Sequence, residues 1–192
     1  MIVKRFKQWM RGAKPSDSAE AGGPADEPPS RVLMVCMGNI CRSPIAEGVL
    51  RAKLRQLGLA GKVLVDSAGT HGYHTGEAPD PRAIRQAAQR GYDIAGLQAR
   101  PVREEDFQRF DWLLAMDEAN LAWLQRHRPA DTPARAALFM SYARQHTEVL
   151  EVPDPYYGAT EGFDHVLDLV EDACEGFVAQ LTDPSSPRSR RF

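Results

Sequence analysis

A cysteine and an arginine stand six residues apart in one short segment, at Cys36 and Arg42, and Ser43 directly follows the arginine. An apolar run at 32–35 precedes the cysteine, and Pro44 with a helical pattern follows the serine. This order predicts a loop between a buried strand and a helix. Backbone N–H groups and one guanidinium of such a loop can surround an anion, so a thiolate there can attack the phosphorus of a phosphate ester.

The reactive form of this cysteine is the thiolate, and several features of the loop favour it. Arg42 adds a fixed positive charge, and the helix that begins near Ser43 directs the positive end of its dipole at the loop. Gly38 and Asn39 tolerate the left-handed backbone angles that turn N–H groups inward. The hydroxyl of Ser43 could also donate to the sulfur. The predicted phosphate-binding residues are Met37, Gly38, Asn39, Ile40, Cys41 and Ser43.

Cleavage of a phosphate ester also needs a proton donor for the leaving group, and Asp154 is the candidate. It is the first residue of the segment 154–158, in which proline and glycine predict a rigid exposed turn. A turn-capping aspartate accounts equally well for this pattern. Tyr156 and Tyr157, with Tyr73, could wall a slot for a flat ring, and ordinary packing of loop tyrosines is the alternative.

Two more cysteines accompany the candidate nucleophile. Cys41 stands five residues after Cys36, so it could form a reversible disulfide with an oxidised Cys36 and protect it from further oxidation. A packed loop thiol is the alternative. Cys174 falls on the apolar face of the predicted last helix and is expected to be structural.

The composition predicts one soluble folded domain. The chain has 192 residues, 43% hydrophobic and 26% charged, with a formal net charge of −2, which favours neither nucleic acid nor a membrane. Three cysteines are too few for a disulfide framework and indicate a reducing, cytoplasmic location. The scattered cysteines and histidines lack metal-ligand spacing, so no metal is expected.

The two ends of the chain differ from the middle. Residues 1–30 are predicted to be a disordered extension, 31–182 the folded domain and 183–192 a flexible tail. Residues 1–14 carry five basic residues and no acidic one, and a helix there would be amphipathic. A weak contact with an anionic membrane surface and a solvated tail are both consistent with this segment.

Strand and helix patterns alternate between the two ends. This alternation predicts a parallel sheet with helices on both faces, in which ligands bind beyond the carboxyl ends of the strands. Ser43 is expected to cap the first helix, and Gly91 to end another. The expected strands are 31–35, 63–65, 112–116 and 136–140, and the segment 99–102 is expected to be either a short strand or an extended segment. The expected later helices are 81–90, 104–110, 117–126 and 163–181.

Together these residues resemble the low-molecular-weight protein tyrosine phosphatases over roughly residues 31–182. The segments that carry the resemblance are 35–44 (VCMGNICRSP), 66–70 (DSAGT), 79–83 (PDPRA), 115–117 (AMD) with Asn120, and 154–158 (DPYYG). The resemblance implies a three-layer α/β/α fold with a four-stranded parallel sheet and a phosphate-binding loop after the first strand. It also implies phosphotyrosine proteins as substrates and no metal or cofactor.

The resemblance further implies a role for each candidate residue. Cys36 would form a cysteinyl-phosphate, Arg42 would bind the phosphoryl oxygens, and Asp154 would protonate the leaving phenol and then activate water. The residues implied to line the substrate cleft are Tyr73, Tyr156 and Tyr157.

The same resemblance implies support for the loop from residues around it. Asn39 would hold the loop in a strained shape with help from Ser67, and Ser43 would stabilise the thiolate. The chain departs from the family just before its Ala99-Arg100 pair, where many relatives carry a histidine and this chain has the segment 97–98 (LQ).

Two other functions remain alternatives. A thiol-dependent arsenate reductase resembles the same fold and loop, but it needs a relay of further cysteines, and Cys174 is expected to be buried. A phosphotyrosine-binding module without turnover is the second alternative, although the chain retains the nucleophile, the arginine and the candidate acid together.

Overall fold

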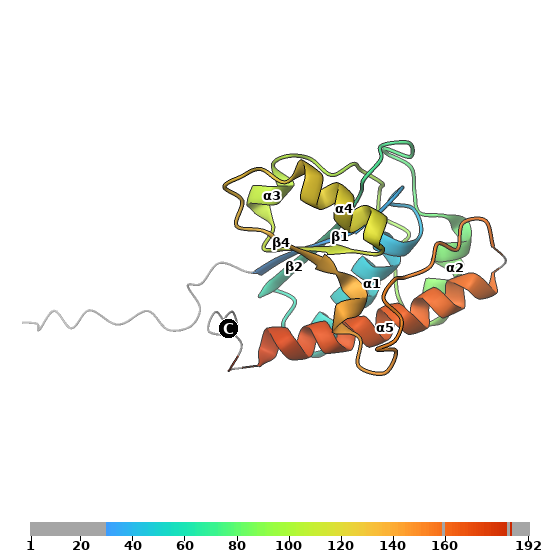
Figure 1. Cartoon of the computed structure of the whole chain (residues 1–192). Coiled ribbons are helices and arrows are strands. Elements are labelled where there is room, and N and C mark those ends of the chain that lie inside the picture. Colours follow the sequence, from blue (N-terminus) through green and yellow to red (C-terminus); the bar gives the residue numbers. More distant parts are fainter. Residues whose placement is uncertain (1–29, 159, 184, 186–192) are drawn as a thin grey trace, which may run out of the picture.

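A parallel sheet of four strands, in the order β2-β1-β3-β4, forms the centre of the fold (Figure 1). The structure is a computed structural model, and it describes residues 30–158, 160–183 and 185. Its elements are β1 (Ser30–Cys36), α1 (Arg42–Gln56), β2 (Val63–Gly69), α2 (Pro81–Gln89), α3 (Asp106–Arg109), β3 (Trp112–Ala115), α4 (Glu118–His127), β4 (Arg135–Leu138), the 3-10 helix η1 (Phe139–Tyr142) and α5 (Glu161–Thr182). The predicted fold, a four-stranded parallel sheet between helices, is confirmed.

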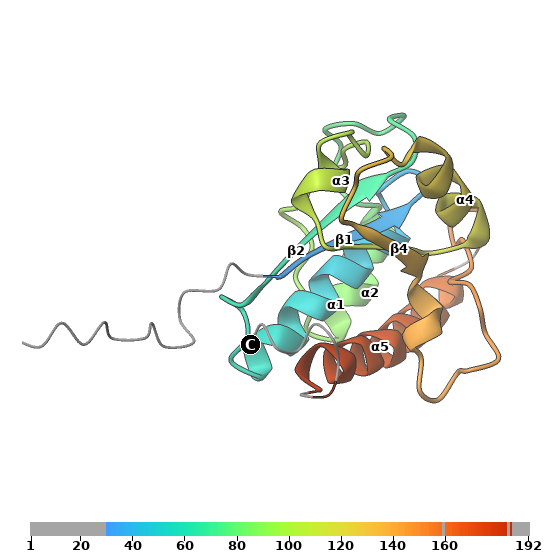
Figure 2. The same ribbon diagram turned by 60° about the vertical axis from the view of Figure 1, so that its left-hand side comes forward.

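Helices cover both faces of the sheet and so make three layers (Figures 1 and 2). Helices α1, α2 and α5 pack on one face, and α3 and α4 pack on the other. Successive residues of β1 point to opposite faces, because side chains alternate along a strand. Val32 and Met34 belong to the core beneath α1 and α5, and Leu33 and Val35 belong to the core beneath α3 and α4.

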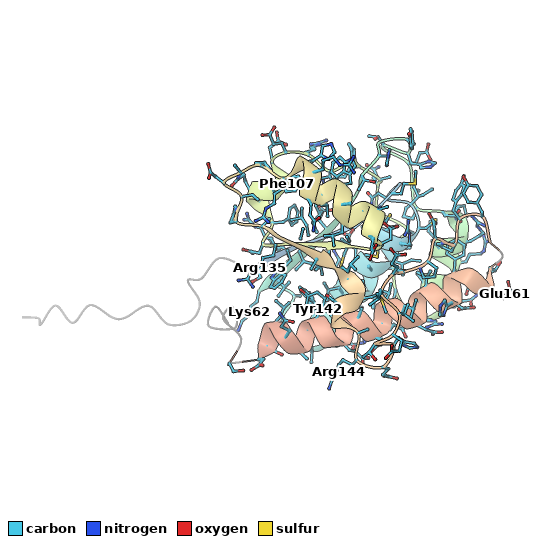
Figure 3. All side chains as sticks on the ribbon, in the orientation of Figure 1. Lys62, Phe107, Arg135, Tyr142, Arg144 and Glu161 are labelled. Atoms are coloured by element: carbon cyan, nitrogen blue, oxygen red, sulfur yellow. The ribbon has the colours of Figure 1, made fainter. Side chains whose placement is uncertain are left out.

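The long helix α5 closes the larger core. The ring of Trp112 on β3 meets that of Phe177 on α5 edge to face, with 5.6 Å between ring centroids, and Tyr142 meets Phe177 at 5.0 Å. Figure 3 shows Tyr142 beside α5 and Phe107, a residue of α3, on the opposite side of the sheet. Each helical layer therefore has its own aromatic contacts with the sheet.

The order of the strands sets the position of the site. Strand β1 lies between β2 and β3, and the chain leaves β1 for a helix on one face but leaves β3 for a helix on the other. This divergence opens a crevice beyond the carboxyl ends of β1 and β3. In the sheet register Cys36 pairs with Gly69 and Val35 with Ala115, so the segments after these strands begin side by side.

Side chains next to the site also start two helices. Pro81 is the first residue of α2, and Oδ1 of Asp80 accepts the N–H of Arg82 at 2.7 Å. Oδ1 of Asp117 accepts the N–H of Asn120 at 2.7 Å at the start of α4. Both aspartates have a second carboxylate oxygen, which remains for contacts in the site.

Some local predictions differ from the structure. Of the two alternatives for 99–102, a short strand or an extended segment, the structure has the extended segment, in which Pro101 forms an isolated bridge with Gly69. The strand expected at 136–140 ends at Leu138, where η1 begins. Ser43 does not cap α1, which begins one residue earlier and has no side-chain cap.

The predicted terminal extensions, including the basic segment 1–14, lie almost wholly outside the described residues. Ser30 is buried as the first residue of β1. None of the described helices combines the length and the apolar character needed to cross a bilayer.

Candidate active site

Cys36 is the last residue of β1, and its buried thiol faces the loop that leads into α1. The backbone N–H of Asn39 donates to Sγ of Cys36 at 3.3 Å, and Oγ of Ser43 lies 3.0 Å from the same atom. The first turn of α1 follows directly, so the positive end of its dipole is near the sulfur. The N–H of Asn39 and the start of α1 place positive potential at the sulfur atom, and the Ser43 hydroxyl does so when it donates to the sulfur.

The backbone of the loop is strained at one residue. Gly38 and Asn39 both tolerate left-handed angles, and of these two residues only Asn39 adopts them, with φ of 57°. Gly38 instead leaves space, because a Cβ there would lie 3.1 Å from Cδ2 of His74. His74 therefore lies against the loop, and its Nδ1 is 2.7 Å from Oε2 of Glu77.

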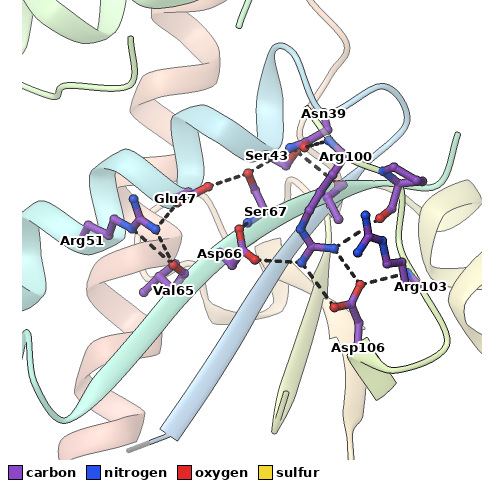
Figure 4. A network of polar contacts seen from close by, with 12 residues as sticks. Asn39, Ser43, Glu47, Arg51, Val65, Asp66, Ser67, Arg100, Arg103 and Asp106 are labelled. Carbon is purple, nitrogen blue, oxygen red and sulfur yellow. Dashed lines mark hydrogen bonds and ion pairs between the residues drawn. The ribbon is translucent and has the colours of Figure 1, made fainter. Parts of the chain in front are cut away.

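The side chain of Ser43 turns into the loop rather than capping the helix. Its Oγ accepts from Nδ2 of Asn39 at 2.9 Å, and the same Nδ2 donates to Oγ of Ser67 at 2.9 Å (Figure 4). Ser67 in turn donates to Oε2 of the buried Glu47 at 2.5 Å. The N–H of Arg100 donates to Oδ1 of Asn39 at 2.9 Å. Both ends of the Asn39 amide are thus held, which offsets the strain of its backbone.

Arg42 is buried at the start of α1, and two acidic side chains hold its guanidinium. Nη1 donates to Oδ2 of Asp117 at 2.5 Å and to the carbonyl of Val152 at 3.1 Å, and Nη2 donates to Oδ2 of Asp154 at 3.1 Å. Burial lowers the pKa of this guanidinium, but the facing Cys36 and the two carboxyl groups raise it above its ordinary value. Arg42 is therefore a permanent cation beside the sulfur.

Asp154 lies at the edge of the site, with 42% of its side chain exposed. Its Oδ1 accepts the N–H of Tyr156 at 3.2 Å, which is a turn-capping contact. Its Oδ2 accepts from Arg42. Asp154 can therefore cap the turn and also act in catalysis, because one carboxylate oxygen holds the turn and the other faces the site.

The segment around α2's start ties the cysteine loop to the Asp154 turn. The N–H of Asp80 donates to the carbonyl of Ile40 at 2.8 Å. Nη2 of Arg82 lies 2.8 Å from Oδ2 of Asp80, and the same guanidinium donates to the carbonyls of Tyr156 at 3.0 Å and Gly158 at 3.2 Å. These contacts fix the distance between the cysteine loop and the Asp154 turn.

These groups enclose a cavity of about 300 Å³. The three predicted cleft tyrosines all line it and are between 40% and 96% exposed. The rings of Tyr156 and Tyr157 meet edge to face, with 4.9 Å between centroids. The side chains of Asn39, Ser43 and Ser67 are not among those that line the cavity. The residues that line the cavity are Cys36, Met37, Gly38, Ile40, Cys41, Arg42, Tyr73, His74, Asp154, Tyr156 and Tyr157.

The three cysteines, all among the described residues, are free thiols. Burial, followed by the charge of Asp80, raises the pKa of Cys41 to about 12. Burial also raises the pKa of Cys174, which is fully buried in the core beneath α5. A disulfide between Cys36 and Cys41 stays a prediction. Over the described ranges, no group of three or more His, Cys, Asp or Glu side chains could hold a metal ion.

The sequence alone assigns no role to three residues that contribute to this site, namely Asp117, Arg82 and Glu47. Asp117 follows β3 at the carboxyl edge of the sheet, which is a signal that could have identified it. Arg82 lies in the resembling segment 79–83, but its contact with the Asp154 turn is remote in sequence. Glu47 lies on the buried face of α1 and offers no pattern that distinguishes it from a solvated helix residue.

The chain is similar to known proteins over nearly all of its described length. A model of the family described as low molecular weight phosphotyrosine protein phosphatase matches residues 31–186. A low molecular weight protein-tyrosine-phosphatase of Streptomyces coelicolor is 41% identical over 161 residues, which are 83% of this chain and 98% of the relative. The low molecular weight phosphotyrosine protein phosphatase of Homo sapiens is 38% identical over 156 residues, or 80% of this chain and 97% of the relative.

The fold is also similar to that of a solved structure. The protein tyrosine phosphatase of Entamoeba histolytica, crystallised with Hepes in its active site, superposes with a TM-score of 0.77 at 38% sequence identity. The superposition covers 80% of this chain and 97% of that one. Residues 31–186, which the family model matches, contain β2, β3 and β4, all but the first residue of β1, and every residue that lines the cavity.

Proposed function

The chain belongs to the low molecular weight phosphotyrosine protein phosphatase family, and we propose that Cys36 is its nucleophile, Arg42 its phosphate-binding cation and Asp154 its proton donor. It is a protein tyrosine phosphatase, and its substrates are phosphoproteins. One observation carries the assignment of residues: all three side chains line a single cavity of about 300 Å³.

The first chemical step transfers the phosphoryl group to sulfur. The Cys36 thiolate attacks phosphorus, a P–S bond forms, and the P–O bond to the leaving phenol breaks. Arg42 has donors for the equatorial oxygens of the transferring group, on which negative charge is spread. Asp154 gives its proton to the departing phenolate oxygen, since an unprotonated phenolate is the poorer leaving group.

The second step releases phosphate. Asp154, now a carboxylate, takes a proton from a water molecule that attacks the phosphorus of the cysteinyl-phosphate. The P–S bond breaks, and the electron pair returns to Cys36 as the thiolate. Ser43 and the N–H of Asn39, both within 3.3 Å of the sulfur, stabilise the charge that returns to it.

The aromatic lining supports phosphotyrosine as the substrate side chain. Tyr73, Tyr156 and Tyr157 offer ring faces and edges to the phenyl ring of a substrate, in the slot that leads to Cys36. A cytoplasmic location is part of this proposal, and the free thiols of the chain are consistent with a reducing compartment.

The two alternative functions have less support. A thiol-dependent arsenate reductase needs accessible cysteines for its relay, but Cys174 is fully buried and burial raises its pKa. A binding module without turnover has no need of an acid beside the arginine, and Asp154 lies 3.1 Å from Arg42.

The test is the hydrolysis of phosphotyrosine peptides by the wild-type protein and by Cys36→Ser. We expect Cys36→Ser to lose turnover, because a serine hydroxyl in this loop is a far weaker nucleophile, and to retain phosphate binding through Arg42 and the loop. Cys174→Ser, which changes a thiol remote from the cavity, is the control and should keep its activity. Retained turnover in Cys36→Ser would contradict the proposal.

A further inference from the structure

An ion pair between α1 and β2 is connected to the cysteine loop through buried side chains (Figure 4). Nη2 of Arg51 lies 2.6 Å from Oε1 of Glu47, one helical turn away. The same guanidinium donates to the carbonyl of Val65 on β2, from Nη2 at 2.8 Å and from Nε at 3.2 Å. Arg51, whose side chain is 43% exposed, therefore contacts the buried carboxyl group of Glu47 from the protein surface.

The two oxygens of Glu47 have separate partners. Oε2 accepts the hydroxyl of Ser67 at 2.5 Å. Oε1 is buried without an aligned hydrogen bond, so its contact with Arg51 is one of charge. An ionised carboxyl group in this place depends on the guanidinium, since burial penalises an uncompensated charge.

The donor and the acceptor of each hydrogen bond between Glu47 and the loop can be assigned. Ser67 uses its only hydrogen on Glu47, so it accepts from Nδ2 of Asn39. Nδ2 is the end of that amide which must face the serines, because Oδ1 accepts the N–H of Arg100. Donation to a carboxylate also makes the Ser67 oxygen a stronger acceptor. The ionised form of Glu47 thus holds Asn39 more firmly than the neutral form does.

We propose that Arg51 is a positioning residue of the phosphatase reaction, which acts through Glu47 and Ser67 to hold Asn39 in the conformation that directs its N–H at Cys36. This inference rests on the proposed role of Cys36 as nucleophile. Arg51 itself touches neither the cavity nor the sulfur.

The charges around Glu47 give this role a dependence on pH. Burial raises the pKa of Glu47 to about 7, and Ser67 and Arg51 act against burial. From the neighbouring elements, Asp66 on β2 raises this pKa further and Arg100 lowers it. Glu47 is therefore neutral well below pH 7 with or without Arg51. Above pH 7 it is ionised in the wild type, and loss of Arg51 delays that ionisation to higher pH.

The experiment compares Arg51→Gln with Arg55→Gln, which removes the same charge from an exposed position one turn further along α1. The measured quantity is kcat/KM for p-nitrophenyl phosphate from pH 5 to pH 8. We expect the two variants to agree at pH 5 and Arg51→Gln to fall about tenfold below Arg55→Gln at pH 8, the size of a typical coupling between contacting residues. Arg51→Lys keeps the charge and should recover most of the loss.

A second pair of variants tests the route. Glu47→Gln removes the titrating group but keeps an oxygen that can accept from Ser67. In that background Arg51→Gln should cause no further change at pH 8, since no charge is left to compensate. Thermal unfolding of each variant identifies any that fail to fold.

Three results would overturn the inference. These are equal activity of Arg51→Gln and Arg55→Gln at every pH, a loss that does not change with pH, or an undiminished loss in the Glu47→Gln background. Failure of the proposed function looks different, because the wild-type protein would then lack phosphatase activity or Cys36→Ser would retain it.

Discussion

Arg42 is held on both sides by carboxylates, Asp117 within the site and Asp154 at its edge. The two contacts differ in burial: the Asp117 side chain is 19% exposed and that of Asp154 is 42% exposed. The Asp154 contact is thus the one that solvent and substrate can reach. Asp117 fixes the guanidinium, and Asp154 remains free to exchange its contact with Arg42 for one with the substrate.

The role of Asp154 predicts how activity depends on the leaving group. In Asp154→Asn the side chain keeps its shape but has no acidic proton, so kcat/KM for phenyl phosphate, which reports the steps up to release of the phenol, should fall by about 10²–10⁴-fold. For p-nitrophenyl phosphate, whose phenolate leaves without protonation, kcat/KM should fall much less. The comparison of kcat/KM for the two esters checks this, and equal losses would show that Asp154 does not protonate the leaving group.

Spacing in the sequence was sufficient to predict the three proposed catalytic residues. Cys36 and Arg42 lie on one loop, and Asp154 precedes a proline, so each has a local signal. Asp117 and Glu47 act through contacts with Arg42 and Ser67 that span 75 and 20 residues, and such contacts depend on the packing of elements rather than on local pattern.

At the scale of elements, the end of β2 supports the cysteine loop directly. The carbonyls of Met37 and Cys36 accept the N–H groups of His71 and Thr70, at 3.0 and 2.9 Å. Gly69 lies between these segments, and a Cβ there would be 2.7 Å from the carbonyl oxygen of Met37. The loop therefore rests on a glycine that has no room for a side chain.

Gly69→Ala should reduce both stability and activity. The added methyl group must displace backbone, so we expect a loss of about 1–3 kcal/mol in the free energy of unfolding. It should also lower kcat/KM, because the displaced backbone belongs to the phosphate loop. Gly96→Ala is the control, since a Cβ there meets nothing within 4 Å. Urea denaturation and kinetics of both variants check the prediction, and identical behaviour of the two would contradict it.

The order and type of the main elements could be predicted because apolar periodicity and helix-end signals agree along most of the chain. The errors lie where a tertiary contact overrides a local signal. Serine often caps helices, but the hydroxyl of Ser43 accepts a hydrogen bond from Asn39 and lies near the sulfur of Cys36.

For the whole molecule, all the proposed catalytic and cleft residues lie between residues 36 and 157 of the described part. The sheet, both cores and the cavity are built from residues 30–182. We therefore propose 31–182 as the phosphatase domain, which carries the chemistry, and residues 1–14 as a separate basic segment for weak contact with anionic membranes.

Removal of residues 1–29 should separate these two properties. We expect the shortened protein to keep the kcat/KM of the full chain for p-nitrophenyl phosphate. Its sedimentation with phosphatidylserine vesicles should fall, since five basic residues are lost. Vesicle binding that does not change on removal would contradict the membrane contact, and a large loss of kcat/KM would contradict the domain boundary.

The central claim is that the phosphoryl group passes through the sulfur of Cys36, and rapid acid quench tests it most directly. The protein is mixed with p-nitrophenyl phosphate, quenched within one turnover, digested and mapped by mass spectrometry. We predict phosphate on the peptide that contains Cys36, bound to its sulfur, and none on that peptide in Cys36→Ser. Turnover with phosphate on a different residue, or with no phosphorylated peptide at any quench time, would contradict the account.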